Sequence, residues 1–177
     1  MSDRTTPTDP PSFAAGLLPA VLDRDTAPFW AAARLRRLTY QTCDACAAVV
    51  FFPRRHCPGC LSAALTWHDS AGLGEVYTYS VVRNSRDPRF ADRVPYCVAW
   101  IDLDEGFRMM SNVVEVDPDA ITVGLRVRVD WRASGDWLLP VFVPADPAGA
   151  TAPAVPANPA VRADPADPAP AVGPGDD

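Results

Sequence analysis

Four of the five cysteines stand in two Cys-x-x-Cys pairs separated by ten residues, and this array constrains the fold more than any other feature. Each pair forms a tight turn that brings two thiolates together, and the connecting segment returns the second pair to complete a tetrahedron. Zinc suits four soft thiolates, and such a site leaves no open position for a reacting water. The pattern predicts structural Zn²⁺ with the ligands Cys43, Cys46, Cys57 and Cys60.

A disulfide or redox role for these cysteines would need a different context. Disulfides persist in oxidising compartments, but the apolar run of residues 13–22 contains Gly16 and Pro19 and lacks the basic start of a signal peptide. A thioredoxin-type motif would open a helix in a βαβ unit, which the flanking sequence does not predict. No stretch reaches the roughly 20 apolar residues of a membrane span, so we expect a cytoplasmic protein with reduced thiols and no membrane partner.

The first part of the chain is expected to hold an extended arm, a helix and the zinc ribbon. Residues 1–27 mix Pro, Thr and Asp without a helical or strand period. A helix is predicted over residues 28–38, and its Phe29 and Trp30 give it an apolar stripe that must dock on this chain's own core or on a partner. The zinc ribbon then covers residues 39–70.

Strand-like segments follow over residues 71–145, three before a short helical turn and two after it. They cover residues 75–83, 96–103, 107–116, 124–131 and 137–143. This order is that of an OB-fold, a five-stranded partly open barrel, with an SH3-like barrel as the nearest competitor. Residues 146–177 are rich in Pro and Ala, which predicts a disordered tail. The expected fold class is mainly β: an N-terminal helix, a rubredoxin-like zinc ribbon, an OB-fold barrel and the tail.

The sequence predicts no catalytic residues. Cys97 lies in a near-continuously apolar segment and is expected to be a small buried residue, because a nucleophile would need a neighbouring base. Asp102, Asp104 and Glu105 fall in a turn, where we expect solvated charges.

The segment between the first two predicted strands is the candidate for ligand binding. Residues 83–93 carry four arginines against two aspartates, in a loop that OB-folds commonly use for ligands. Guanidinium groups bind phosphates bidentately, so Arg83, Arg86 and Arg89 are candidates to hold a phosphate-rich small molecule. A solvated charged loop is the competing interpretation.

Several motifs together carry a family resemblance over about residues 28–145. They are Phe29-Trp30, the four paired cysteines with Pro53-Arg54, Trp67, Gly72-x-Gly74-x-Val76-Tyr77-Thr78-Tyr79, Pro95-Tyr96, Glu105-Gly106, Gly124 and the Val127 strand. With these motifs the chain resembles the zinc-ribbon plus OB-fold proteins long filed as a domain of unknown function and now regarded as acyl-CoA-associated. Two positions depart from the family pattern: Phe52 stands where Pro is usual, and Leu61 stands where Gly is common.

The resemblance implies an obligate partner of thiolases, thiolase-like aldolases or acyltransferases, in steroid side-chain degradation, aromatic catabolism or mevalonate synthesis. In such a hetero-oligomer this chain would be a non-catalytic accessory or scaffold subunit that helps to bind acyl-CoA, with Arg83, Arg86 and Arg89 at the CoA phosphates. The partner would supply the catalytic residues.

Two other functions stay open: a nucleic-acid-binding protein, and a stand-alone acyl-CoA or redox enzyme that uses Cys97. Binding to a nucleic-acid backbone depends on net positive charge. Residues 28–145 hold equal numbers of Arg and of Asp plus Glu, and the segments on both sides are acidic. We therefore expect no nucleic-acid partner.

Overall fold

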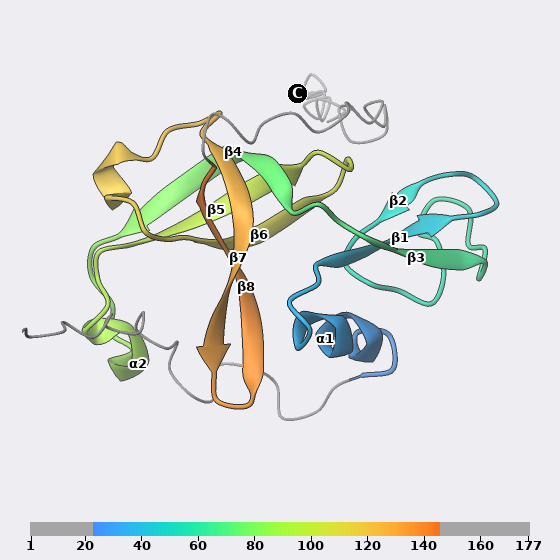
Figure 1. The fold of residues 1–177 in the computed structure, drawn as a ribbon, viewed down its shortest axis with the longest axis horizontal. Helices are drawn as coiled ribbons and strands as arrows, with labels where there is room; N and C mark the ends of the chain where they lie inside the picture. The colour runs from blue at the N-terminus through green and yellow to red at the C-terminus, as the bar shows by residue number, and fades with distance from the viewer. Residues whose placement is uncertain (1–22, 146–177) are drawn as a thin grey trace, which may run out of the picture.

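The computed structural model describes residues 23–145, which form a short helix, a small sheet and a β-barrel (Figure 1). The predicted tail and nearly all of the predicted arm lie outside these residues. The helix and the sheet consist of α1 (Ala27–Ala33), β1 (Thr39–Cys43), β2 (Val49–Val50) and β3 (Leu65–Asp69). The sheet has the order β2-β1-β3, with both pairings antiparallel. No described helix is long and apolar enough to cross a membrane.

Five strands close into a barrel in the order β4-β5-β6-β8-β7, and β7 pairs back onto β4. The strands are β4 (Leu73–Val82), β5 (Tyr96–Leu103), β6 (Arg108–Val113), β7 (Arg126–Ser134) and β8 (Trp137–Pro144). A helical turn, η1 (Pro118–Ala120), separates the first three strands from the last two, as the sequence predicted. The strand order and the position of this turn confirm the predicted OB-fold.

Side-chain alternation along β5 explains why this segment forms a barrel strand. Cys97, Ala99, Ile101 and Leu103 point inward, and each is at most 4% exposed. A strand places every second residue on one face, so these four positions supply one side of the barrel core. The prediction that Cys97 is a small buried residue is confirmed.

Helix α1 ends at Ala33, several residues before the predicted end at residue 38. Arg36 has a left-handed backbone with a φ of 57°, which turns the chain out of the helix. The N–H of Arg37 donates to the carbonyl of Ala32 at 3.1 Å and closes this turn. The good helix formers in residues 34–38 had suggested a longer helix, but the chain must reverse here to enter β1.

The apolar stripe of α1 docks on this chain's own core, one of the two predicted alternatives. Phe29 is only 7% exposed and belongs to the barrel's hydrophobic cluster. Trp30 packs edge-on against Trp137 of β8 with ring centroids 5.8 Å apart, and the guanidinium of Arg34 lies 4.7 Å above the same Trp137 ring. The helix therefore seals one side of the barrel.

Four aromatic rings join the zinc ribbon to the barrel, and we call Phe29, Tyr40, Phe51 and Phe107 the aromatic junction. Phe51 follows β2 of the ribbon, and its ring centroid lies 4.6 Å from that of Phe107, which precedes β6 of the barrel. Tyr40 of β1 stacks on Phe107 at 5.2 Å, and Phe29 meets Phe51 edge-on at 6.0 Å. Ribbon and barrel therefore share one core.

The turn that was predicted to hold solvated carboxylates is ion-paired instead, so that prediction was wrong. Asp102 accepts two hydrogen bonds from Arg108, at 2.5 and 3.0 Å. Asp104 accepts two from Arg126, at 2.8 and 2.7 Å. Arg108 lies opposite Asp102 in the same hairpin, whereas Arg126 comes from β7, 22 residues from Asp104 in sequence.

Glu105 departs furthest from the expectation of a solvated charge, because it is only 8% exposed. Its Oε1 accepts a hydrogen bond of 2.6 Å from the N–H of Ala71, in the linker between ribbon and barrel, while Oε2 has no partner among the described residues. Burial, and to a smaller extent the charge of Glu105, raises the pKa of Tyr40. This carboxylate therefore fixes the linker beside the aromatic junction.

Candidate functional site

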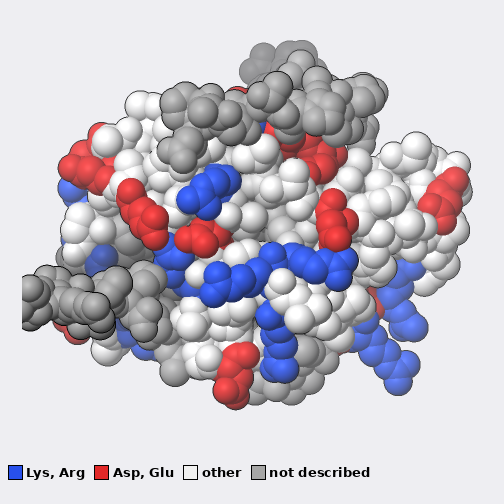
Figure 2. Space-filling model, in the orientation of Figure 1, with Lys and Arg blue, Asp and Glu red and all other residues white. Residues whose placement is uncertain are grey.

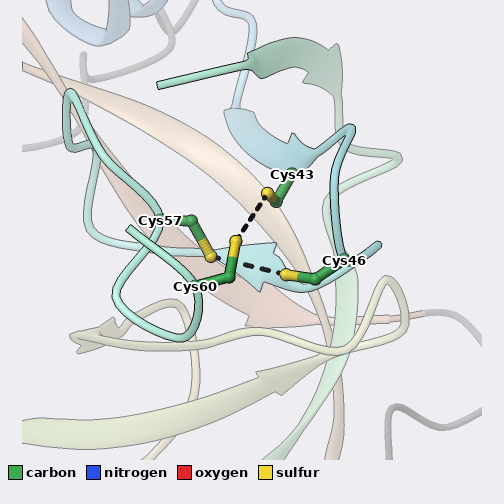
Figure 3. Close-up of side chains that lie close together, drawn as sticks. All are labelled: Cys43, Cys46, Cys57 and Cys60. Carbon is green, nitrogen blue, oxygen red and sulfur yellow. Dashed lines mark hydrogen bonds between the residues drawn. The ribbon is translucent and has the colours of Figure 1, made fainter. Parts of the chain in front are cut away.

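Four cysteine sulfurs converge at one end of the small sheet (Figure 3). Cys43 ends β1, Cys46 lies in the turn that follows, and Cys57 and Cys60 lie between β2 and β3. Their Sγ atoms all lie within 4.8 Å of one another, with Cys43 to Cys60 at 3.5 Å and Cys46 to Cys57 at 3.6 Å. A tetrahedral site with Zn–S bonds of about 2.3 Å places its sulfurs roughly 3.8 Å apart, so the four cysteines fit zinc.

The two cysteine pairs have the same backbone conformation. The N–H of Ala47 donates to the carbonyl of Cys43 at 2.8 Å, and the N–H of Leu61 donates to the carbonyl of Cys57 at 2.9 Å. Ala47 and Leu61 both have left-handed backbones, with φ values of 59° and 61°. Glycine adopts this conformation without a steric penalty, whereas a residue with a Cβ is strained there. Leu61, which stands where Gly is common in the family, is therefore held in a strained backbone conformation.

Backbone N–H groups favour the thiolate of Cys57, whereas the pKa of Cys60 in the same pair is raised above its ordinary value. The N–H of Cys60, with a smaller contribution from that of Gly59, lowers the pKa of the Cys57 thiol to about 7. The thiolate is the form that binds metal, so this lowering favours the bound state. Zinc held here would be enclosed by four protein sulfurs, so its role would be to hold the ribbon together and not to activate water.

Cys97 lacks the surroundings of a nucleophile. Burial raises the pKa of its thiol, which disfavours the reactive thiolate. The cavity that Cys97 lines has no histidine in its walls. His68 lies in the ribbon instead, with its Nε2 at 2.8 Å from the Thr42 hydroxyl.

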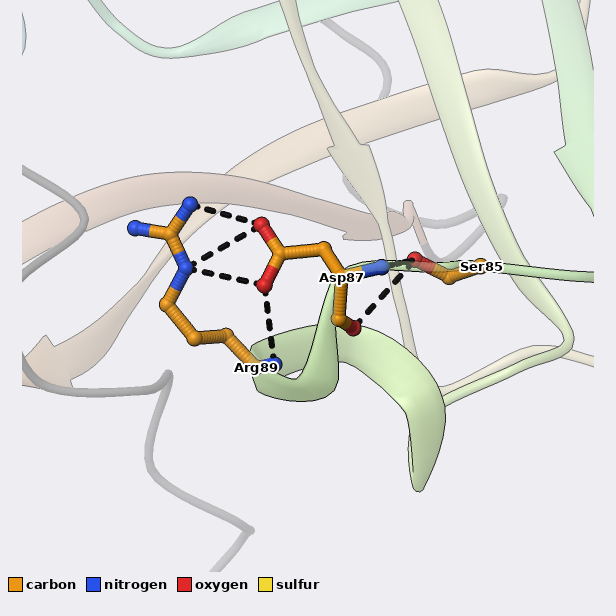
Figure 4. Close-up of polar contacts among 3 residues, drawn as sticks. All are labelled: Ser85, Asp87 and Arg89. Atoms are coloured by element: carbon orange, nitrogen blue, oxygen red, sulfur yellow. Dashed lines mark hydrogen bonds and ion pairs between the residues drawn. The ribbon is translucent and has the colours of Figure 1, made fainter.

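The first loop of the barrel contains a helical turn, α2 (Pro88–Ala91), that the sequence prediction missed (Figure 4). Asp87 caps it by accepting the N–H of Arg89 at 3.0 Å, while the hydroxyl of Ser85 accepts the N–H of Asp87 at 3.2 Å. Asp followed by Pro is a helix-start signal, so the turn was readable from the local sequence.

The three arginines proposed to bind phosphate have different partners. The guanidinium of Arg89 folds back on Asp87, with a shortest contact of 2.6 Å, which raises the pKa of Arg89 and lowers that of Asp87. Arg83 forms an ion pair with Asp119 of η1. Arg86 is exposed and has no ion-pair partner within residues 23–145.

A cavity of about 430 Å³ opens beside this loop, between α2, the ends of β5 and β6, and η1. The ion pair between Arg83 and Asp119 links the loop to η1. This cavity was not predictable from the sequence, because its walls come from segments that lie far apart in the chain.

A four-cysteine ribbon that shares its core with an OB-fold barrel defines the class: this is a zinc-ribbon plus OB-fold protein. A family model described as "ChsH2, rubredoxin-like zinc ribbon domain" matches residues 30–66, and another described as "ChsH2, C-terminal OB-fold domain" matches residues 67–132. The chain belongs to this ChsH2 family of zinc-ribbon and OB-fold proteins, also described as DUF35.

Similar proteins include subunits and scaffold proteins. A "Probable enoyl-CoA hydratase alpha subunit" from Thermomonospora curvata is 40% identical over 127 residues, which are 71% of this chain but only 39% of that protein. A "DUF35 domain-containing scaffold protein" from Methanothermobacter thermautotrophicus is 38% identical over 96 residues, which are 54% of this chain and 71% of that protein. A chain of the solved "Ltp2-ChsH2(DUF35) aldolase" is 40% identical, with a TM-score of 0.66, and the match covers 73% of this chain and 100% of the other.

Proposed function

We propose that this chain is a non-catalytic accessory subunit of a thiolase-like enzyme, such as a thiolase, an aldolase or an acyltransferase. The observation that carries the proposal is the match to the whole of one chain in a solved aldolase whose description joins that DUF35 protein to Ltp2. The name of the archaeal relative, a scaffold protein, points the same way. The partner would supply the catalytic residues.

An exposed apolar surface supports docking of such a partner. Trp100 of β5 and Met110 of β6 lie directly opposite each other, and they are 38% and 54% exposed. Met110 also lines a groove with Phe52 of the ribbon, which is 52% exposed. We call Phe52, Trp100 and Met110 the apolar band. Aromatic residues and Met are enriched at protein interfaces, so we assign this band to the thiolase-like subunit.

The loop of residues 83–93 is assigned to the phosphates of acyl-CoA. Arg86 is exposed, has no ion-pair partner among residues 23–145 and would offer its guanidinium directly. Arg83 and Arg89 would exchange a carboxylate for a phosphate, and this exchange is easy because both of their ion pairs are largely exposed. Exposed pairs of this kind contribute only about 0–1 kcal/mol. The CoA thioester in the name of the Thermomonospora relative agrees with this ligand class.

Nucleic acid is a weaker candidate for the partner. Positive and negative side chains are interspersed over the face that Figure 2 shows, and at least seven of the fourteen arginines in residues 23–145 have a carboxylate partner. Nucleic-acid-binding surfaces instead gather positive charge along a groove. With acyl-CoA as the favoured ligand, we propose that the chain acts in acyl-CoA metabolism, as in steroid, lipid or aromatic catabolism. We also propose that it acts in the cytoplasm, where thiols stay reduced.

Affinity purification of the tagged chain from its native host tests the proposal. We expect a thiolase-like protein to co-purify, and we expect carbon–carbon bond cleavage or formation on acyl-CoA only with that protein present. Changing Met110 to Arg should abolish the complex, while Val123→Arg, at a position 66% exposed on another part of the barrel, should not.

Two results would contradict the accessory role. One is robust turnover by the isolated chain, and loss of that turnover in Cys97→Ser would assign it to a stand-alone enzyme. The other is failure of the chain to bind any thiolase-like protein from the same cell.

The assignment of the loop to the CoA phosphates has its own test. Changing Arg83, Arg86 and Arg89 together to Ala should weaken acyl-CoA binding and leave assembly intact. Loss of assembly would instead assign the loop to the interface.

A further inference from the structure

We propose that the cavity between α2, the ends of β5 and β6, and η1 binds the acyl group of the thioester. This inference rests on the proposed function, which places the CoA phosphates at residues 83–93. The cavity has a volume of about 430 Å³, within the range of roughly 300–1,000 Å³ that is usual for small-molecule sites.

The walls of the cavity are mainly apolar. Phe90 of α2 and Tyr96 of β5 stack with ring centroids 5.7 Å apart and an interplanar angle of 30°, and both rings line the cavity. Val114, Val116 and Pro118 contribute from the segment between β6 and η1. Aliphatic and aromatic side chains around a concave space suit a hydrocarbon chain or ring, which gains free energy by leaving water.

The charged groups around the cavity favour an uncharged ligand group. The lining holds two arginines, Arg93 and Arg132, and two acidic residues, Asp92 and Glu115, so their formal charges cancel. Arg132 is the most buried of these side chains, at 8% exposed, and it is held by ion pairs with Asp130 and Glu115. Its guanidinium is already neutralised and does not offer a free cation to a carboxylate. An acyl group in thioester linkage therefore fits better than a free fatty acid.

One loop connects the two parts of the proposed ligand site. Residues 83–93 carry the arginines on the surface and also contribute Phe90 to the cavity wall. On the opposite side, Asp119 pairs with Arg83, and its neighbour Pro118 lines the cavity. The pantetheine arm separates the phosphates of CoA from its thioester, so a ligand with its phosphates at the arginines would have to fold this arm back over the loop to place its acyl end in the cavity.

Calorimetric titration of the full chain with coenzyme A, acetyl-CoA, butyryl-CoA and hexanoyl-CoA tests this inference. Burial of one methylene contributes about 0.8 kcal/mol, so each added methylene should tighten binding about fourfold until the cavity is full. Val114→Phe should fill the cavity, remove this dependence on chain length and leave the affinity for coenzyme A unchanged. Val123→Phe, which adds the same ring at an exposed position that does not line the cavity, should keep the dependence.

The outcomes separate this inference from the proposed function. If coenzyme A binds but chain length has no effect, the acyl site is refuted and the phosphate site stands. Retention of the full chain-length dependence in a Val114→Phe chain with normal zinc content and melting temperature would also refute the acyl site. If no thioester binds the chain, alone or with its thiolase-like partner, the acyl site and the phosphate site both fall, while the accessory role is judged by complex formation. Equal affinity for free hexanoate would show a fatty-acid site instead.

Discussion

Replacing Leu61 by Gly should tighten zinc binding, because Leu61 is held in a left-handed conformation beside the second cysteine pair. An L-residue with a Cβ loses roughly 1–2 kcal/mol in this region relative to glycine. The greater freedom of glycine in the unfolded chain offsets about 0.4–1 kcal/mol of that gain. The Leu61 side chain is 76% exposed, so its removal sacrifices little packing. The net stabilisation of the ribbon is about 0.5–1 kcal/mol.

Zinc affinity is the measurement that detects this change, because folding of a four-cysteine ribbon and metal binding are linked. A stabilisation of about 0.5–1 kcal/mol corresponds to roughly two- to fivefold tighter binding. The zinc-loaded full chain and its variants would be titrated with a competing chelator of known affinity under reducing conditions. Ala47→Gly should act in the same direction at the first pair, because Ala47 has the same backbone conformation.

Leu61→Ala is the matched control, because it removes the exposed apolar side chain but keeps the Cβ that causes the strain. Its zinc affinity should stay close to that of the parent chain. If Leu61→Ala tightened zinc binding as much as Leu61→Gly, the effect would come from the lost side chain. Weaker binding by Leu61→Gly would show that backbone strain at this position is not what limits the ribbon.

Three further outcomes are expected. Cys57→Ser should reduce the zinc content measured by mass spectrometry and lower the melting temperature, since one thiolate is lost; unchanged values would argue against the four-cysteine site. Deletion of residues 147–177 should leave zinc content and melting temperature unchanged, because their Pro- and Ala-rich composition cannot build a core, and a large loss of stability would show that they dock. Glu105→Ala should lower the free energy of unfolding by about 1–3 kcal/mol in chemical denaturation, because it leaves the N–H of Ala71 unpaired. Glu105→Gln keeps an acceptor and should lose less. Equal losses in both variants would exclude this hydrogen bond as the cause.

The parts of this protein that were predictable from sequence depend on short-range patterns. The spacing between Cys43 and Cys46 fixes one local turn, and the alternation from Cys97 to Leu103 fixes which side of one strand faces the core. The zinc-ribbon and OB-fold order followed from a succession of such local signals. Each of them operates within a few residues along the chain, so it needs no knowledge of the packed structure.

Features that join distant segments were not predictable in the same way. Arg83 and Asp119 are 36 residues apart in sequence, and only the closed barrel brings them together. The burial of Glu105 depends on the linker at Ala71, 34 residues away. The cavity between α2, β5, β6 and η1 was not predictable for the same reason. Helix α1 was predicted too long because helix propensity carries no information on where the chain must reverse.

The aromatic junction also determines what happens when zinc is scarce. Phe51 of the ribbon lies against Phe107 of the barrel, so a ribbon that opens without metal also uncovers part of the barrel core. A metal-free chain would present aromatic surface suited to aggregation or to capture by chaperones and proteases. The supply of zinc in the cell would then set how much of this chain is folded and able to dock the proposed thiolase-like subunit.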